Sequence, residues 1–354
     1  MKAIILAGGS GTRLWPVSRR GKPKQIQPFL DRDTLLQKTF SRTKKIFPIS
    51  DIIVSTGKQQ ARDVRDQLKR WRFNQCIVEP CKRDTAAAIG LVAVYLYHDN
   101  PHESLLTINS DHYIQDEPQY FAAVRAVVKF LAAYPDHTVL LGVRPTYPET
   151  GYGYIQKGKK ISGGAFQVKR FVEKPDFETA KKYLNAKTYL WNPAVFAWRV
   201  DHLLQLYRRH LPQLHRILMK IESAIGTKRE QQVLSREFAR LTPISIDYGL
   251  MEKLTGAVAV VAGAYRFTDI GHWETLRSVL ADERGNVIKG LSVVYDSSGN
   301  LIYNFTDRLV ATAGLTNTII VQTEDALFVC PRHRAADAKQ VVKLLEQRGW
   351  NKFL

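Results

Sequence analysis

A glycine-rich segment near the start of the chain has the residue types needed to hold a triphosphate. It follows the apolar run of residues 4–7, and it is flanked by Arg13 and then by Lys24. Glycine has no Cβ, so backbone N–H groups in such a loop can approach phosphate oxygens closely. The two basic side chains would add positive charge beside the loop. The candidate nucleotide-binding residues of this segment are Leu6, Ala7, Gly8, Gly9, Gly11, Thr12 and Arg13.

Two better-known glycine loops do not fit this segment. The dinucleotide fingerprint G-x-G-x-x-G needs a third glycine or an alanine where Leu14 stands. The P-loop needs a glycine where Pro16 stands and a Ser or Thr where Pro23 stands. A plain glycine-rich turn with a basic flank remains the structural alternative.

Two aspartates stand where a strand should end, which suits a divalent cation. Asp111 follows an apolar run that ends at Ile108, and Asp269 follows a second such run before Gly271. Mg²⁺ prefers oxygen ligands and usually takes only one or two carboxylates besides phosphates and water. Asp111 as an ordinary loop residue and Asp269 as a helix N-cap are the structural alternatives.

The elements that would position these residues alternate between strands and helices. Apolar runs predict strands at residues 52–54, 76–78, 104–108 and 138–142, and longer periodic stretches predict helices at 59–70, 85–97 and 119–133. This alternation indicates an α/β fold with a mostly parallel, Rossmann-like sheet. Ligands of open α/β sheets bind at the carboxyl ends of strands, which is where the glycine segment and Asp111 fall.

The texture changes near residue 284. Short β-rich runs separated by Gly, Asn, Asp or Ser predict a small C-terminal β unit, followed by a helix near residues 335–348 that Gly349 ends. We therefore expect a catalytic α/β domain over residues 1–283 and a small β-rich domain over residues 284–354.

Composition sets the broad class of the protein. The chain has 354 residues, 45% of them hydrophobic, and a formal net charge of +19. Its basic residues are spread along the chain, so we expect attraction of anionic substrates and no specific nucleic acid partner. No apolar stretch approaches the length of a membrane span, and three sparse cysteines fit a reducing, cytoplasmic setting.

The N-terminal segment LAGGSGTRLWPVSRRGKPKQ (residues 6–25) closely resembles the signature of sugar-1-phosphate nucleotidylyltransferases, and most of all that of the mannose-1-phosphate guanylyltransferases. The resemblance implies Mg²⁺-dependent transfer of GMP from GTP to mannose 1-phosphate. It assigns catalytic roles to Arg13, Lys24, Asp111 and Asp269, with the two aspartates as metal ligands. It also implies that the C-terminal β unit is a short left-handed β-helix.

Further motifs of the same family follow in order. The segment from Glu79 through Arg83, Asp84 and Thr85 resembles its base and ribose element. The candidate sugar-phosphate residues are Gly151, Tyr152, Gly153, Glu173, Lys174, Asn192 and Asp247. The chain departs from the family pattern at Asp84 (usually Asn), at Pro193 and Ala194 (usually Ser and Gly) and at His272 (usually Ser). His112 and His272 are read as supporting or substrate-facing.

Three alternatives stay open at this point. The same chemistry could use another sugar 1-phosphate, such as a heptose phosphate, or another NTP. A catalytically silent homologue that binds nucleotide sugars is a second reading, against which Arg13, Lys24 and the two aspartates argue. A nucleic-acid binder is a third. A homodimer is considered, although the sequence does not give the oligomeric state.

Overall fold

The computed structural model describes residues 1–9 and 11–354, and its backbone divides into two compact units. Unit 1 contains Met1–Gly8, Phe40–Asn109 and Ile114–Phe267. Unit 2 contains Gly9–Thr39, Ser110–Tyr113 and Thr268–Leu354. Each unit therefore draws on both halves of the sequence, and each is described by itself.

Unit 1 is built on one large mixed sheet, which has ten strands within the described residues, in the order β11-β8-β7-β9-β6-β10-β4-β1-β2-β3. Strands β4, β1, β2 and β3 are mutually parallel, whereas β10 and the β7–β9 region pair antiparallel. The bounds are β1 Lys2–Leu6, β2 Ile52–Gly57, β3 Cys76–Glu79, β4 Ser104–Asn109, β6 Thr138–Val143, β7 Gly153–Lys160, β8 Ala165–Val172, β9 Tyr189–Asn192, β10 Phe196–Arg199 and β11 Val258–Gly263.

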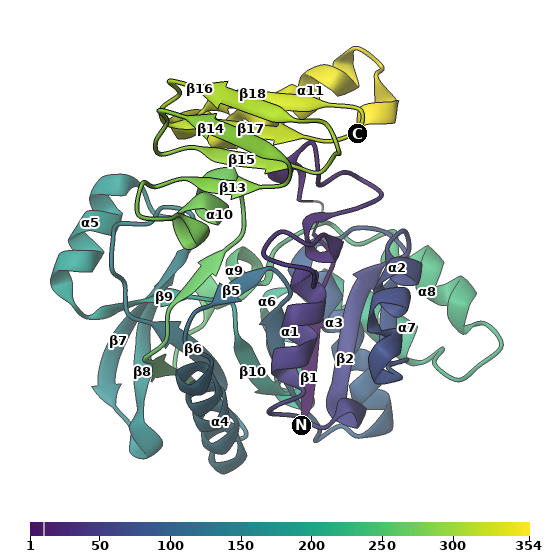
Figure 1. The fold of residues 1–354 in the computed structure, drawn as a ribbon. Helices are drawn as coiled ribbons and strands as arrows, with labels where there is room; N and C mark the ends of the chain where they lie inside the picture. Colours follow the sequence, from purple (N-terminus) through teal and green to yellow (C-terminus); the bar gives the residue numbers. More distant parts are fainter. Residues whose placement is uncertain (10) are drawn as a thin grey trace. The chain divides into compact units, whose positions relative to one another are not determined.

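Helices cover this sheet, with α4 in front of it and α3, α6 and α7 behind it in the view of Figure 1. Helix α3 is buried on nearly all sides and is rich in Ala, Leu and Val, so it packs closely against its neighbours. The bounds are α1 Leu35–Thr43, α2 Ala61–Leu68, α3 Asp84–Asp99, α4 Glu117–Ala133, α5 Phe177–Ala186, α6 Val200–His210, α7 Pro212–Glu222, α8 Glu230–Phe238 and α9 Ile246–Gly249.

Unit 2 combines the N-terminal glycine-rich segment with the C-terminal β strands. Strands β13, β15, β17 and β18 form one sheet, β14 and β16 another, and β5 pairs with β12. The bounds are η1 Thr12–Leu14, η2 Lys24–Ile26, β5 His112–Ile114, β12 Phe267–Asp269, α10 Trp273–Leu280, β13 Val287–Lys289, β14 Ser292–Tyr295, β15 Leu301–Asn304, β16 Val310–Ala313, β17 Thr318–Gln322, β18 Leu327–Pro331 and α11 Ala338–Gln347.

Successive turns of the C-terminal chain stack on one another. Val287 lies in register with Leu301, and Leu301 with Ile319, in parallel ladders. The buried Asn300 joins these levels, because its amide donates to the carbonyl of Leu315 at 2.8 Å and its side-chain oxygen accepts from the N–H of Thr318 at 2.8 Å. Stacked parallel levels with satisfied buried asparagines are the arrangement of a β-helix.

The predicted α/β fold and the β-rich C-terminal part are confirmed. The strands and helices expected in the N-terminal half are present, although the antiparallel pairings of β7 to β10 make the sheet mixed; β11 pairs parallel with β6. The last helix begins at Ala338, later than expected, because residues 332–337 form a 3₁₀ helix. The boundary at residues 283 and 284 stays a prediction. No helix in the described chain is long and apolar enough to cross a membrane.

Candidate active site

The end of strand β1 brings the first glycine of the loop beside a buried carboxylate in unit 1. A Cβ atom added to Gly8 would lie 3.4 Å from Oε1 of Glu79. Ser55 on β2 donates to the same oxygen at 3.4 Å. Burial raises the pKa of Glu79 to about 7, and the nearby Asp84 adds to the rise. The carboxyl of Glu79 is therefore poised to change charge near neutral pH.

Gly11 is required by both its conformation and its surroundings in unit 2. Its φ of +60° lies in the left-handed region, and an added Cβ would lie 2.6 Å from Oγ of Ser18 and 2.9 Å from Cβ of Lys24. Nearby, Gln25 donates from Nε2 to the carbonyl of Gly9 at 3.0 Å. The loop thus folds tightly onto the segment that carries Lys24. Ser10 lies outside the described residues.

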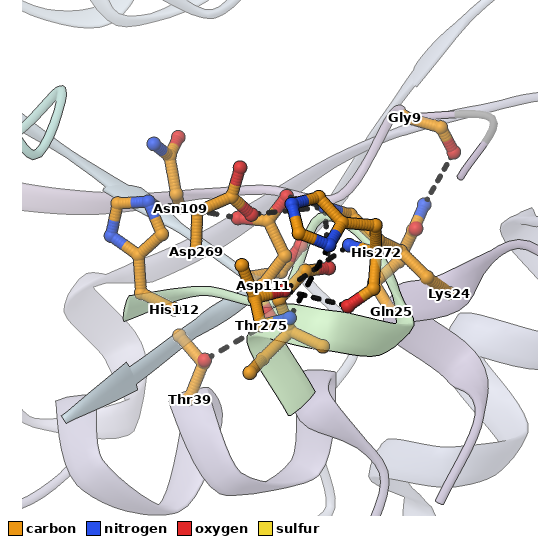
Figure 2. Close-up of polar contacts among 12 residues, drawn as sticks. Gly9, Lys24, Gln25, Thr39, Asn109, Asp111, His112, Asp269, His272 and Thr275 are labelled. Atoms are coloured by element: carbon orange, nitrogen blue, oxygen red, sulfur yellow. Dashed lines mark hydrogen bonds and ion pairs between the residues drawn. The ribbon is translucent and has the colours of Figure 1, made fainter. Parts of the chain in front are cut away.

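Lys24 joins the two candidate metal ligands (Figure 2). Its Nζ lies 2.9 Å from Oδ2 of Asp111 and 3.1 Å from Oδ1 of Asp269. The same ammonium donates to the carbonyl of Ile270 at 3.0 Å. All three N–H donors of this buried lysine therefore have acceptors. The structure brings together three of the four predicted catalytic residues.

The charges of this cluster reinforce one another. Burial alone would lower the pKa of Lys24, but Asp111 and Asp269 outweigh it and hold the pKa above its ordinary value. Burial would raise the pKa of Asp111, but the Lys24 ammonium outweighs it and holds the pKa low. Both groups of the Lys24–Asp111 pair are therefore charged over the physiological pH range.

The two carboxylates fit a magnesium ion that takes most of its ligands from elsewhere. Asp111 and Asp269 converge on one positive charge, and both offer the oxygen ligands that Mg²⁺ prefers. Across residues 1–9 and 11–354, no group of three or more His, Cys, Asp or Glu side chains is placed to hold a metal. An ion here would take its remaining ligands from phosphate and water.

Arg13 and the two histidines surround this cluster. Nη1 of Arg13 lies 3.9 Å from the position that a Cβ on Gly271 would take, and Oδ2 of Asp269 lies 3.3 Å from it. Nε2 of His112 lies 3.9 Å from Oδ1 of Asp111. His272 caps helix α10, because its Nδ1 accepts from the N–H of Thr275. This cap agrees with the prediction that His272 has a supporting role.

The predicted base and ribose segment forms the start of α3 in unit 1. Asp84 has a φ of +67°, and its carboxylate accepts from the N–H of Thr85 at 2.7 Å. Thr85 accepts in turn from the N–H of Ile246 at 2.8 Å. The guanidinium of Arg83 donates to the carbonyl oxygens of Lys82 and Ala239. Nε of Arg83 is buried and has no hydrogen-bond partner among the described residues, while Asp84 is exposed.

The predicted sugar-phosphate residues form a second cluster in unit 1. Nζ of Lys174 lies 2.6 Å from Oε1 of Glu173, and Asn192 donates to Oδ1 of Asp247 at 3.1 Å. Burial and the neighbouring Glu173 raise the pKa of Asp247 to about 7. Oε2 of Glu173 is buried and has no hydrogen-bond partner among the described residues. An orphaned buried acceptor is costly unless a ligand completes it.

Glycine and aromatic residues pack closely around this cluster. A Cβ on Gly153 would lie 2.5 Å from Oε2 of Glu173. The ring of Tyr152 stacks on that of Phe267, with 5.1 Å between the ring centroids, and it meets the ring of Trp191 edge-on, with 5.5 Å between the centroids. Gly151 donates its N–H to the carboxylate of Glu149 at 2.7 Å. Gly153 therefore belongs to the polar cluster, whereas the side chain of Tyr152 belongs to its aromatic wall.

Sequence reasoning did not identify several residues that support these clusters. Glu252 accepts from the N–H of Glu173 at 2.9 Å, and Ser55 touches Glu79. Gln25, which donates to the Gly9 carbonyl, is next to Lys24 in the N-terminal motif. Its place in that motif could have indicated a supporting role. Ser55 on a buried strand and Glu252 on a short 3₁₀ turn gave no such signal.

Comparisons with known proteins agree with this arrangement. The model of the nucleotidyl transferase family matches residues 2–284, and that of the MannoseP isomerase/GMP-like beta-helix domain matches residues 290–345. The mannose-1-phosphate guanylyltransferase of Klebsiella pneumoniae is 35% identical over 99% of this chain and 75% of the relative. The xanthan biosynthesis protein XanB of Xanthomonas campestris pv. campestris is 36% identical over 98% of this chain and 73% of the relative.

Solved structures give the same result. The mannose-1-phosphate geranyltransferase from Thermus thermophilus superposes with a TM-score of 0.85 at 34% identity, over 98% of this chain and 99% of that one. The mannose-6-phosphate isomerase from Helicobacter pylori shares the fold, with a TM-score of 0.62 at 21% identity, over 76% of this chain and 99% of that one. The chain belongs to the nucleotidyl transferase family and, within it, to the mannose-1-phosphate guanylyltransferases.

Proposed function

We propose that this protein transfers GMP from GTP to mannose 1-phosphate and releases GDP-mannose and pyrophosphate. The observation that carries the proposal is the convergence of Lys24, Asp111 and Asp269 beside the glycine-rich segment. Such a cluster offers both a fixed positive charge and two carboxylates for a divalent cation. The names of the relatives supply the sugar phosphate and the nucleotide.

The reaction asks for positioning and charge neutralisation more than for acid–base chemistry. An oxygen of the sugar phosphate attacks the α-phosphorus of GTP. The bond from that phosphorus to the bridging oxygen breaks, and pyrophosphate leaves with the electron pair. The attacking oxygen is already anionic, so no proton has to be removed. We assign Arg13 and Lys24 to the departing pyrophosphate, whose growing charge they would stabilise.

Asp111 and Asp269 would hold Mg²⁺. When bound there, the ion would neutralise phosphate charge and favour one arrangement of the phosphates. Lys24 orients the two aspartates, because its ammonium contacts one oxygen of each carboxylate. Together the two carboxylates would supply the oxygen ligands that the ion prefers.

The unit 1 clusters would bind the rest of the two substrates. We assign Gly8, Glu79, Arg83, Asp84 and Thr85 to the nucleoside. At the second cluster, the unpartnered Oε2 of Glu173 would accept from a sugar hydroxyl. Lys174 would hold the sugar's phosphate as a point charge. Asn192 and Asp247 would complete the pocket, and binding there would satisfy the orphaned acceptor.

A second candidate is the same chemistry with another sugar 1-phosphate or NTP. Two departures favour it. Asp84 offers only acceptors where an Asn would also donate, and Ala194 has a φ of +49°, a conformation that favours glycine. Pyrophosphate release measured over a matrix of NTPs and sugar 1-phosphates separates the two. We expect the highest kcat/KM for GTP with mannose 1-phosphate.

A cytoplasmic location and a homodimer remain expectations.

A further inference from the structure

The glycine-rich N-terminal segment over residues 9–26, called the phosphate-loop segment from here on, has two limbs. Each limb carries one of the two basic catalytic candidates. The 3₁₀ helix Thr12–Leu14 holds Arg13 on the first limb, and the 3₁₀ helix Lys24–Ile26 holds Lys24 on the second. A tight turn joins the limbs, since the N–H groups of Arg19 and Lys22 each donate to the other's carbonyl, at 3.0 and 3.1 Å. A shift of this turn would move both limbs.

Arg19 fixes this turn to the hairpin between β17 and β18. Its Nη1 donates to Oδ2 of Asp325 at 2.7 Å and its Nη2 to Oδ1 at 2.6 Å. Nε of the same guanidinium donates back to the carbonyl of Pro16 at 2.7 Å. The guanidinium also lowers the pKa of Asp325. This two-point geometry restricts orientation as well as distance, which a single-point ion pair does not.

Packing does little to hold the turn against the hairpin. A cavity of about 530 Å³ lies between them, lined by Val17, Gly21 and Lys22 from the segment and by Phe305, Glu324 and Asp325 from the β strands. The first limb is better seated, because Trp15 donates to the carbonyl of Phe353 at 2.8 Å and Trp273 donates to that of Trp15 at 2.9 Å. Among the described residues, Arg19 holds the turn to the hairpin through both carboxylate oxygens of Asp325 and through the Thr323 hydroxyl at 3.5 Å, and the contacts with Asp325 are the shorter ones.

We propose that the Arg19–Asp325 ion pair is a positioning contact for catalysis, which fixes the phosphate-loop turn so that Arg13 and Lys24 hold the triphosphate in place. Neither Arg19 nor Asp325 touches the substrate in this role. Both act through the limbs on either side of the turn. The inference rests on the proposed binding of GTP by this segment.

The chain supplies a matched control pair. Arg20, next to Arg19, contacts Glu346 on α11, and its Nη2 lies 2.6 Å from Oε1. The side chain of Arg20 is 59% exposed against 18% for Arg19, while the two carboxylates are similarly exposed, at 42% for Glu346 and 45% for Asp325. Glu346→Gln removes a surface ion pair that joins the same turn to α11, and it leaves the Arg19–Asp325 contact in place. It should leave both kinetics and melting temperature close to those of wild type.

The test compares Asp325→Asn, Arg19→Gln, their double variant, Asp325→Glu and Glu346→Gln. We expect Asp325→Asn to lower kcat/KM for GTP about tenfold, because small misplacements of substrate-holding groups lower rates strongly. The KM for mannose 1-phosphate should stay near its wild-type value. The double variant should be no worse than either single one, and Asp325→Glu should recover part of the loss. Affinity for Mg²⁺–GTP, measured calorimetrically, should fall in parallel.

Circular dichroism and melting temperature show whether each variant is folded. Arg19→Lys keeps the charge but loses the two-point geometry, and it replaces any variant that does not fold. The inference is overturned if folded Asp325→Asn matches Glu346→Gln in GTP kinetics, or if the single losses multiply in the double variant. It is also overturned if the KM for mannose 1-phosphate rises as much as that for GTP. A wild-type protein that neither binds nor turns over GTP contradicts the proposed function instead.

Discussion

The ammonium of Lys24 lies 2.9 Å from the carboxylate of Asp111, although the two residues come from distant parts of the chain. This contact joins the phosphate-loop segment to the turn after β4. It gives the segment a fixed point inside unit 2 and keeps the Asp111 carboxylate ionised. The basic and acidic parts of the proposed chemistry are therefore a single cluster.

Removing either proposed metal ligand should nearly abolish turnover. We expect Asp111→Asn and Asp269→Asn each to lower kcat on the order of 10²–10³-fold, the scale of losing one preorganised charge-stabilising group. Initial rates at limiting Mg²⁺ measure the effect, and Mn²⁺ binding followed by electron paramagnetic resonance should weaken as well. The exposed Asp307 provides the control Asp307→Asn. A folded variant with near-normal rates at limiting Mg²⁺ would remove that aspartate from the site.

The two lysines should separate by kinetic parameter. Lys24→Ala should lower kcat more than it raises the KM for mannose 1-phosphate, because Lys24 is assigned to the pyrophosphate side. Lys174→Ala should mainly raise that KM. Steady-state kinetics with each substrate varied in turn measure both, with the exposed Lys181→Ala as a surface control. Identical patterns in the two variants would show that this division of roles is wrong.

The buried Glu79 should make stability fall as pH rises. Its folded pKa of about 7 lies above the ordinary 4.5, so the folded state binds the proton more tightly. The resulting stabilisation is complete below about pH 4.5 and is lost as pH rises through 7. The shift corresponds to on the order of 3 kcal/mol.

Urea unfolding at pH 5 and pH 8 tests this. The fall in the free energy of unfolding between the two should be smaller in Glu79→Gln than in wild type, and unchanged in the exposed control Glu283→Gln. Equal falls in wild type and Glu79→Gln would show that Glu79 titrates normally.

The turn after Asn192 should tune sugar selectivity. Ala194 holds a φ of +49°, so Ala194→Gly relieves backbone strain, and Pro193→Ser restores a backbone donor. We expect wild type to accept mannose 1-phosphate, because Glu173, Lys174 and Asn192 are present. The double change should alter the ratio of kcat/KM for mannose, glucose and heptose 1-phosphates about threefold to tenfold, the value of one hydrogen bond. Identical ratios would mean that this turn does not face the sugar.

The fold was largely predictable because local patterns carry it. The apolar run before the glycines, the Ala-rich stretch that became α3 and the short β runs after residue 284 each bury a face that the pattern identifies. The antiparallel strands around β7–β9 were harder, since periodicity shows that a strand exists but not the direction of its partner.

The candidate site was predictable as residues but not as contacts. The motifs identified Lys24, Asp111 and Asp269, yet nothing local indicates that one ammonium bridges both carboxylates. Left-handed backbone at Asp84, Lys174 and Ala194 depends on tertiary context. The Arg19–Asp325 pair joins residues 306 positions apart. Arg19 lies within the N-terminal signature, but nothing in the sequence indicates that Asp325 is its partner.

The most direct test of the central claim follows the α-phosphate. The protein is incubated with GTP labelled at the α-phosphate, mannose 1-phosphate and Mg²⁺, and the products are separated and quantified. The account predicts label in GDP-mannose, with one pyrophosphate released for each GDP-mannose formed and no release of inorganic phosphate. Label that stays in GTP, or appears only in GDP or GMP whether or not mannose 1-phosphate is present, would contradict it.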